Sequence, residues 1–230
     1  MYHKVNLLPP KARHQGNYVL PEAFDAQLAA LKSWGYESVT FDDWLGFRDG
    51  SADLPKRPLI ITFDDGYRST HDIAWPLLRS HGFSATVFLV SGLIGKTNTW
   101  DTDEIQEPLL PLDEILEMQK GGMIFGSHTR THAALTKIPP ALAKSELEDS
   151  RNELEAMLGR HVTTLCYPYA KQNQAVRDLT RRAGYRSAVI GKGGVNRASA
   201  DAYALRRIKI DTRTTIPRLR WTLLRARFGL

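Results

Sequence analysis

The chain has 230 residues, of which 42% are apolar and 24% are charged, and its net charge is +6 at pH 7. This size and composition allow one substantial hydrophobic core and exclude a largely disordered chain. A membrane-spanning helix is not expected, because no uninterrupted apolar stretch approaches the roughly 18 residues that are needed. The only cysteine, Cys166, excludes an internal disulfide, and the first residues do not read as a signal peptide, so we expect a cytoplasmic protein.

Helices and strands are predicted to alternate along the chain. Apolar residues at helical spacing predict helices from Pro21 to about Gly35 and from Pro140 to Leu158, the second ending at Gly159. Short β-rich runs predict strands at residues 58–63, 84–90, 123–127, 163–167, 186–190 and 204–210. This alternation predicts a parallel sheet with crossover helices, and six to eight such units in one domain favour a barrel over an open sheet.

Two clusters of metal-binding side chains follow predicted strands. Asp64 and Asp65 come after the apolar run 59–63, and His128 and His132 come after residues 123–127. Functional residues of parallel α/β folds gather where strands end, and a spacing of four puts both imidazoles on one side of a helical turn. Two imidazoles and one carboxylate can hold a divalent metal, while the spare carboxylate can act as a base.

Each cluster has a simpler interpretation when it is considered alone. Asp64 and Asp65 before a glycine also fit an ordinary acidic turn, and the two histidines also fit surface or capping positions. Their joint occurrence at predicted strand ends is harder to explain in that way. Together they predict a metal-dependent hydrolase.

The motifs, in this order, resemble those of the polysaccharide deacetylase family, also called the NodB homology or carbohydrate esterase 4 family. Residues 62–66 (TFDDG) are similar to its first motif, residues 127–132 (SHTRTH) to its second, and residues 167–169 (YPY) to a variant of its third. The likeness runs from Tyr2 through about Arg207. It implies an α/β fold, a single-domain distorted (β/α) barrel, and hydrolysis of N-acetyl or sometimes O-acetyl groups on sugars.

The resemblance also implies a role for individual residues. Asp65, His128 and His132 resemble the metal triad, with Zn²⁺ favoured for this donor set and Co²⁺ or Ni²⁺ as alternatives. Asp64 resembles the general base, and Tyr169 the residue whose backbone N–H helps to hold the oxyanion. Such an oxyanion needs the metal and a preorganised donor, and loss of one donor typically costs about 100- to 1000-fold in rate.

The chain departs from the family pattern at two places. The third motif commonly begins with an arginine that orients the base, and Cys166 stands there instead. Another group must therefore orient Asp64, or Asp64 is less well adjusted to its role as a base. The late Leu-x-His motif, which supplies the general acid, is missing, and no histidine follows His161. We expect His3, at the end of the first strand, to protonate the leaving amine. The simpler interpretation is that His3 is a terminal histidine that faces solvent. Metal-bound water acting through Asp64 is another possible source of the proton.

Two further features bear on partners. Trp100 lies in a long loop, where it either stacks on a sugar or anchors that loop to the barrel. Between Arg206 and Leu230 there are eight basic residues and one acid, so the positive charge is assigned to the tail and not to the catalytic body. We expect residues 1–214 to form the barrel and residues 215–230 a basic helix that packs on it or on a membrane surface; nucleic acid is disfavoured.

The sequence therefore predicts a metal-dependent hydrolase that removes N-acetyl groups from amino sugars of a polysaccharide or of a glycolipid or glycan precursor, at the inner membrane face if the tail binds lipid. Within the same chemistry, an O-acetyl ester or a non-sugar amide is the alternative substrate. A catalytically weak carbohydrate-binding module is the alternative of another class, motivated by Cys166 and by the missing late histidine.

Overall fold

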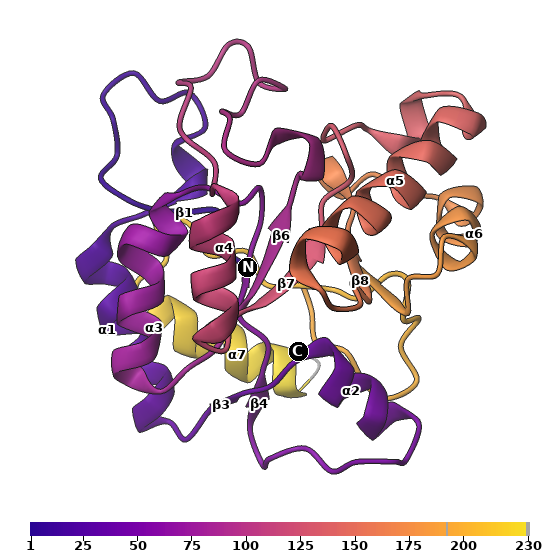
Figure 1. Ribbon diagram of the computed structural model, residues 1–230. Coiled ribbons are helices and arrows are strands. Elements are labelled where there is room, and N and C mark those ends of the chain that lie inside the picture. Colours follow the sequence, from indigo (N-terminus) through magenta and orange to yellow (C-terminus); the bar gives the residue numbers. More distant parts are fainter. Residues whose placement is uncertain (192, 229–230) are drawn as a thin grey trace.

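A five-stranded parallel sheet forms the centre of the protein in a computed structural model that describes residues 1–191 and 193–228 (Figure 1). Its strands follow one another in chain order, and each pairs in parallel with the next. They are β5 (Thr62–Phe63), β6 (Thr86–Leu89), β7 (Ile124–Ser127), β8 (Thr164–Cys166) and β9 (Ser187–Val189). The expected parallel sheet with crossover helices is thereby confirmed.

The sheet curls beyond β9 until its last segment meets the first residues of the chain. Val189 and Leu205 form a parallel bridge, and the backbone N–H of Ile190 donates to the Leu205 carbonyl at 2.8 Å. A few residues later, the backbone nitrogen of Met1 donates to the Ile208 carbonyl at 2.9 Å.

The same N-terminal residues pair on their other side with the start of the sheet. Tyr2 forms a parallel bridge with Phe63, and its backbone N–H donates to the Thr62 carbonyl at 2.8 Å. The backbone N–H of Asp64 donates in turn to the Tyr2 carbonyl at 3.0 Å. These bonds close the sheet into the single-domain distorted barrel that the sequence predicts.

Helices cover the outside of this barrel. Figure 1 shows α1, α3 and α4 on one side of the sheet and α5 and α6 on the opposite side. Two small parallel pairs, β1 with β2 and β3 with β4, extend the structure beside the main sheet. The bounds are β1 (Lys4–Val5), β2 (Tyr18–Val19), α1 (Pro21–Ser33), β3 (Glu37–Ser38), α2 (Phe41–Arg48), β4 (Pro58–Leu59), α3 (Trp75–His81), α4 (Leu112–Lys120), α5 (Pro140–Leu158), α6 (Gln174–Arg182) and α7 (Ile216–Phe228).

Two predicted strands differ in detail from the observed ones. The run 58–63 is split, because residues 58–59 pair with β3 while residues 62–63 enter the main sheet as β5. Residues 204–210 do not form a continuous strand. They contribute isolated backbone hydrogen bonds to β9 and to the N-terminal segment. Both departures lie where a strand changes partner as the barrel curls shut.

Alternation along the strands divides the apolar residues between two cores. The larger core lies between the sheet and the surrounding helices, and the smaller one fills the barrel interior. Phe88, Cys166, Val189 and Leu205 contribute to the smaller core, which α2 closes from below with its own apolar face. The barrel interior is therefore packed beneath the site and does not form a pore.

The basic C-terminal segment packs against the barrel as helix α7. Leu219 is buried in the larger core, and the guanidinium of Arg220 lies 6.0 Å from the ring centroid of Trp34. Trp221 and Leu224 stay exposed on the outer side of the helix. Within the part of the chain that the structure describes, no helix is both long and apolar enough to cross a membrane. The predicted boundary between residues 214 and 215 stays a prediction.

Substitution of Gly126 by alanine is expected to destabilise the barrel. A Cβ atom at this position on β7 would lie 2.6 Å from the Phe88 ring and 2.9 Å from the Thr164 carbonyl oxygen. Overpacking of this kind costs about 1–3 kcal/mol in the free energy of unfolding, which urea denaturation can measure. Gly16→Ala is the control, because its nearest neighbour would be 3.9 Å away. Equal stability of the two variants would contradict the prediction.

Candidate active site

The ends of neighbouring strands bring the predicted site residues to one edge of the barrel. Asp64 and Asp65 follow β5, His128 follows β7, and Tyr169 follows β8 within a short helical turn, Pro168–Ala170. His3 immediately precedes β1, whose segment lies beside β5. The connection from β7 supplies His132.

Asp65, His128 and His132 form a compact buried group. The Asp65 Oδ1 atom lies 3.3 Å from His128 Nε2 and 3.4 Å from His132 Nε2. One potential ligand atom from each residue lies within 4.8 Å of the others, a spacing that can surround one metal ion. These three residues are the set that the sequence predicts.

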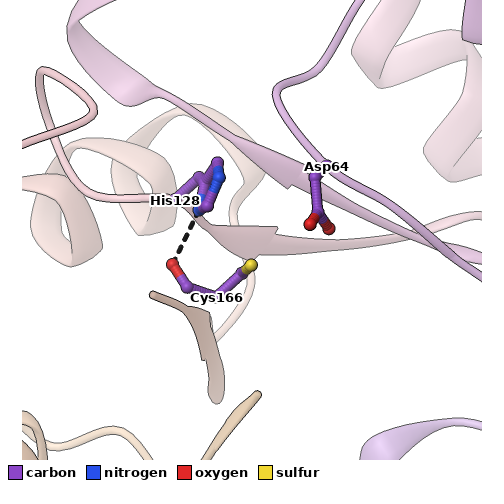
Figure 2. Close-up of side chains that lie close together, drawn as sticks. All are labelled: Asp64, His128 and Cys166. Atoms are coloured by element: carbon purple, nitrogen blue, oxygen red, sulfur yellow. Dashed lines mark hydrogen bonds between the residues drawn. The ribbon is translucent and has the colours of Figure 1, made fainter. Parts of the chain in front are cut away.

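The hydrogen bond on the far side of the His128 ring makes it suitable as a ligand. Figure 2 marks a hydrogen bond between His128 and Cys166, in which His128 Nδ1 and the Cys166 carbonyl oxygen are 2.7 Å apart. A carbonyl oxygen only accepts, so Nδ1 must donate and Nε2 is left to present a lone pair toward Asp65 once the ring is neutral. The donor set of two imidazole nitrogens and a carboxylate therefore fits a divalent metal such as Zn²⁺.

The loop from His128 to His132 is attached to α5 by hydrogen bonds. The Glu146 carboxylate accepts hydrogen bonds from the backbone N–H groups of Arg130 and Thr131, both at 2.9 Å, and from the Thr131 hydroxyl at 2.6 Å. The two histidines do not lie on a helical turn as their spacing suggested, because this segment is an irregular loop. Glu146 thus supplies the acceptor for two backbone N–H groups of this irregular loop.

Backbone strain is concentrated at the same place. Asp65, Thr129, His132, Tyr169 and Ala170 are the non-glycine residues with positive φ, between 55° and 75°, in the described part of the chain. All five belong to the site or adjoin it in sequence. Side chains disfavour this conformation, so the surrounding contacts must hold these residues in place.

Arg207 holds the second carboxylate of the site. Its Nη1 and Nη2 atoms donate to Asp64 Oδ1 at 2.6 Å and to Oδ2 at 2.8 Å. Nη1 also donates to the Thr62 hydroxyl at 3.0 Å, and Nη2 lies 3.1 Å from the Cys166 sulfur. Figure 2 shows the carboxylate of Asp64 and the thiol of Cys166 facing the same space. Arg207 thus supplies the bidentate contact that Cys166 cannot provide.

This pairing corrects the expectation that the basic residues of the tail do not belong to the catalytic body. Arg207 is among those residues, yet it is buried inside the barrel, with its guanidinium 5.5 Å from the ring centroid of Phe88. Its position in sequence gives no indication of this, because about 40 residues separate it from the third motif. The only signal was the predicted strand over 204–210, whose inward-facing residues would enter the barrel.

The charges of the site are set by burial and by these contacts. Burial alone would raise the pKa of Asp64, but Arg207 lowers it to about 2. Burial likewise opposes ionisation of Asp65, and hydrogen bonds with His128 and His132 hold its pKa well below the usual value. Both carboxylates are therefore ionised at neutral pH.

His3 lies beside Asp64 but does not form a hydrogen bond with it. His3 Nε2 is 4.0 Å from Asp64 Oδ2, and burial lowers the pKa of His3 to about 4. The side chain is mostly buried and faces the site, so it is not a solvent-facing terminal histidine. Its role as a proton donor stays a prediction.

Aromatic rings surround His132. The Trp100 ring stacks on the His132 ring with centroids 4.4 Å apart, and the Tyr169 ring meets it edge-on at 4.7 Å. Trp100 therefore contacts the site directly, and Tyr169 lies next to the metal triad. Whether the Tyr169 backbone N–H holds an oxyanion stays a prediction.

Comparison with known proteins assigns the chain to a family. A sequence profile described as polysaccharide deacetylase matches residues 51–188, which is more than half of the chain and includes Asp64, Asp65, His128 and His132. The chain belongs to the polysaccharide deacetylase family. The fold agrees, because a Streptococcus pyogenes deacetylase, PplD, solved in complex with acetate, superposes with a TM-score of 0.84. It is 25% identical, and the match covers 96% of this chain and 95% of PplD.

Two relatives in sequence extend this likeness. YxkH of Bacillus subtilis is 26% identical over 213 residues, which are 92% of this chain and 70% of YxkH. A poly-β-1,6-N-acetyl-D-glucosamine N-deacetylase of Staphylococcus aureus is 27% identical over 178 residues, which are 73% of this chain. The matched part is only 59% of the Staphylococcus aureus protein. Family membership makes the protein a carbohydrate deacetylase of the hydrolase class.

Replacement of Arg207 by methionine is expected to lower the free energy of unfolding by about 3–5 kcal/mol at pH 7, because it leaves a buried carboxylate unpaired. In the parent protein, the depressed pKa of Asp64 contributes stability above pH about 4 that is lost as pH falls through about 2. The unpaired carboxylate of the variant takes up its proton at higher pH. The difference between parent and variant should therefore shrink as the solution is acidified.

Urea denaturation at several pH values between 7 and 3 measures this difference. Arg206→Met is the matched control, because Arg206 is the exposed neighbour in sequence and surface substitutions usually change stability by less than about 0.5 kcal/mol. A difference that stays constant on acidification would show that Arg207 does not act through the Asp64 charge.

Proposed function

We propose that the protein is a metal-dependent deacetylase that hydrolyses N-acetyl groups on amino sugars of a polysaccharide or of a glycan precursor. The observation that carries this proposal is the buried pair of Asp64 and Arg207 beside the Asp65–His128–His132 triad. It supplies an ionised, oriented base next to a metal-ligand set, and amide hydrolysis needs both.

A divalent metal held by Asp65, His128 and His132 would polarise the acetyl carbonyl and lower the pKa of water. Zn²⁺ is the ion that we propose, with Co²⁺ and Ni²⁺ as alternatives that the same donor atoms can accept.

Asp64 is suited to take a proton from the attacking water. Both of its oxygens accept hydrogen bonds from Arg207, so the plane of the carboxylate is fixed while each oxygen keeps lone-pair capacity for a further proton. Its pKa of about 2 keeps it ionised throughout the neutral range, at the cost of some basicity. We propose that the Tyr169 backbone N–H then donates to the developing oxyanion.

His3 is the residue that we propose for protonation of the departing amine. Its Nε2 atom lies 4.0 Å from Asp64 Oδ2, although its lowered pKa of about 4 means that the imidazole is neutral at pH 7. It would therefore relay a proton that Asp64 has taken from water. Direct return of this proton by Asp64 is the alternative route.

The relatives support an N-acetylated glucosamine polymer as the substrate. The Staphylococcus aureus relative is a deacetylase of poly-β-1,6-N-acetyl-D-glucosamine, although this chain spans only 59% of it. An O-acetyl ester or a non-sugar amide is the alternative within the same chemistry. The alternative of a weakly catalytic binding module loses one of its two grounds, because Arg207 replaces the missing arginine.

The place of action is proposed from the sequence alone. A cytoplasmic location, with peripheral contact to the inner membrane face through the exposed Trp221, Arg218 and Arg220 of α7, is compatible with the packing of that helix. Flotation with anionic vesicles, compared between the parent protein and Trp221→Ala, would test the membrane contact. Failure of the parent protein to float would remove it.

Acetate release from N-acetylglucosamine oligomers should require both the metal and Asp64. A chelator is expected to abolish release, Zn²⁺ or Co²⁺ to restore it, and Asp64→Asn to lower kcat by at least about 100-fold, because the base is lost. Asp53→Asn, at an exposed position, is the control and should keep full activity. Release that survives both treatments would contradict the mechanism, and release only from acetyl esters would favour the O-acetyl alternative.

Replacement of His3 by glutamine tests the proton donor. The variant is expected to lose about 100-fold in kcat on an N-acetylated sugar, whose amine must be protonated to leave. It should lose far less on an aryl acetate, because a phenolate leaves without a proton. His81→Gln is the control, since His81 pairs with Asp25 on the surface. Equal losses on both substrates would assign His3 a positioning role instead.

A further inference from the structure

His132 differs from His128 in how its ring is held. His128 Nδ1 bonds to the Cys166 carbonyl, whereas the buried His132 Nδ1 has no hydrogen-bond partner among the described residues. Metal-binding histidines almost always donate their second ring nitrogen to an acceptor that fixes the ring orientation. Among the described residues, ring contacts rather than a hydrogen bond at Nδ1 hold the His132 ring.

Two aromatic rings provide these contacts. The Trp100 ring lies nearly parallel to the His132 ring, with an interplanar angle of 23° and centroids 4.4 Å apart. The Tyr169 ring meets it at 74°, with centroids 4.7 Å apart. The two rings restrict His132 in different directions, which limits both its tilt and its rotation.

Trp100 is carried by a hairpin that projects from the barrel between β6 and α4, at the top of Figure 1. Thr97 and Pro108 form an antiparallel bridge, and the Leu109 N–H donates to the Lys96 carbonyl at 2.8 Å. We call residues 96–109 the Trp100 hairpin. A second bridge, between Tyr67 and Leu109, attaches its base to the chain just after Asp65.

A buried ion pair attaches this hairpin to the N-terminal strand. Lys4, which is 1% exposed, donates to the Glu107 carboxylate, and the Tyr18 hydroxyl donates to the same Oε2 atom at 2.7 Å. The Lys4 ammonium also lies 4.2 Å from the ring centroid of Tyr67. Such a pair holds its partners firmly, because separation would leave a desolvated charge.

The attachment continues from Glu107 to Trp100 through one side chain. Asn98, which is fully buried, accepts from the Glu107 N–H at 2.7 Å and donates to the Ile105 carbonyl at 3.1 Å. Asn98 lies two residues before Trp100, so it fixes the start of the turn that carries the indole.

We propose that Lys4 and Glu107 are positioning residues which, through the Trp100 hairpin, hold His132 in the orientation that the metal requires. Trp100 takes the place of the acceptor that orients other metal-binding histidines. This inference rests on the proposed metal site, and it assigns the indole a role in metal affinity in addition to any contact with sugar.

The metal dissociation constant of the protein without substrate tests the role of Trp100. Competition with a zinc-sensitive dye should show that Trp100→Ala binds Zn²⁺ about 10- to 100-fold more weakly than the parent, which is the usual effect of losing an orienting partner. Trp100→Phe keeps a stacking ring and should recover most of the affinity. Trp221→Ala, which removes an exposed indole on α7, is the control and should bind as the parent does.

The role of the ion pair is tested with Glu107→Gln, which removes the charge but keeps the shape. Hydrogen exchange of residues 96–109 should become faster, and the zinc dissociation constant should rise about 3- to 10-fold. A Lys4→Met/Glu107→Gln double variant should show no further loss, because the pair is already broken.

The outcomes separate this inference from the proposed function. Unchanged zinc affinity in a folded Trp100→Ala protein would overturn the role of the indole. Faster exchange of the hairpin with unchanged affinity in Glu107→Gln would overturn the role of the ion pair. Absence of any divalent-metal binding by the parent protein would instead overturn the proposed function, and this inference with it.

Discussion

The buried contact between Arg207 and Asp64 joins the last segment of the sheet to its first strand inside the barrel. Burial of either charge without the other would be costly, since the desolvation of a single ion in a protein interior costs several kcal/mol. The pair can form only when residues 205–210 and the N-terminal segment have closed the sheet. The segments that close the barrel therefore also bring Arg207 to Asp64, so barrel closure and the orientation of this carboxylate depend on the same part of the chain.

Strain at the site is supported by packing on both sides. His132 and Thr129 adopt left-handed backbone conformations in a loop that Glu146 of α5 holds through backbone N–H groups. Asp65 and Tyr169 adopt such conformations at the ends of β5 and β8. In regular helix or strand geometry these side chains would point in other directions. Their convergence on the site therefore requires backbone strain.

The N-terminal residues serve two purposes because successive side chains of an extended segment point to opposite faces. His3 faces Asp64 in the site, whereas Lys4 faces Glu107 under the Trp100 hairpin. A few residues thus close the barrel, place a proposed proton donor and anchor the hairpin whose Trp100 ring stacks on His132. The chain belongs to the polysaccharide deacetylase family, and the Arg207 guanidinium supplies the contact to Asp64 that Cys166 cannot provide.

The choice of Asp65 over Asp64 as a metal ligand came from the family resemblance. Local sequence was sufficient for the strands of the main sheet, for helices α1 and α5, and for the placement of Asp64, Asp65, His128 and His132 after strand ends. These features depend on periodicity and on residues close to strand ends, which neighbouring positions encode. Arg207, the split of the run 58–63 and the irregular loop between the two histidines were not predictable in that way. Each depends on partners far away in sequence: the Asp64 carboxylate, β3 and Glu146. The sequence by itself determined which side chains follow the strand ends. Only the curled tertiary structure decided that the distant Arg207 would pair with Asp64, because this pairing depends on which segments meet when the barrel closes.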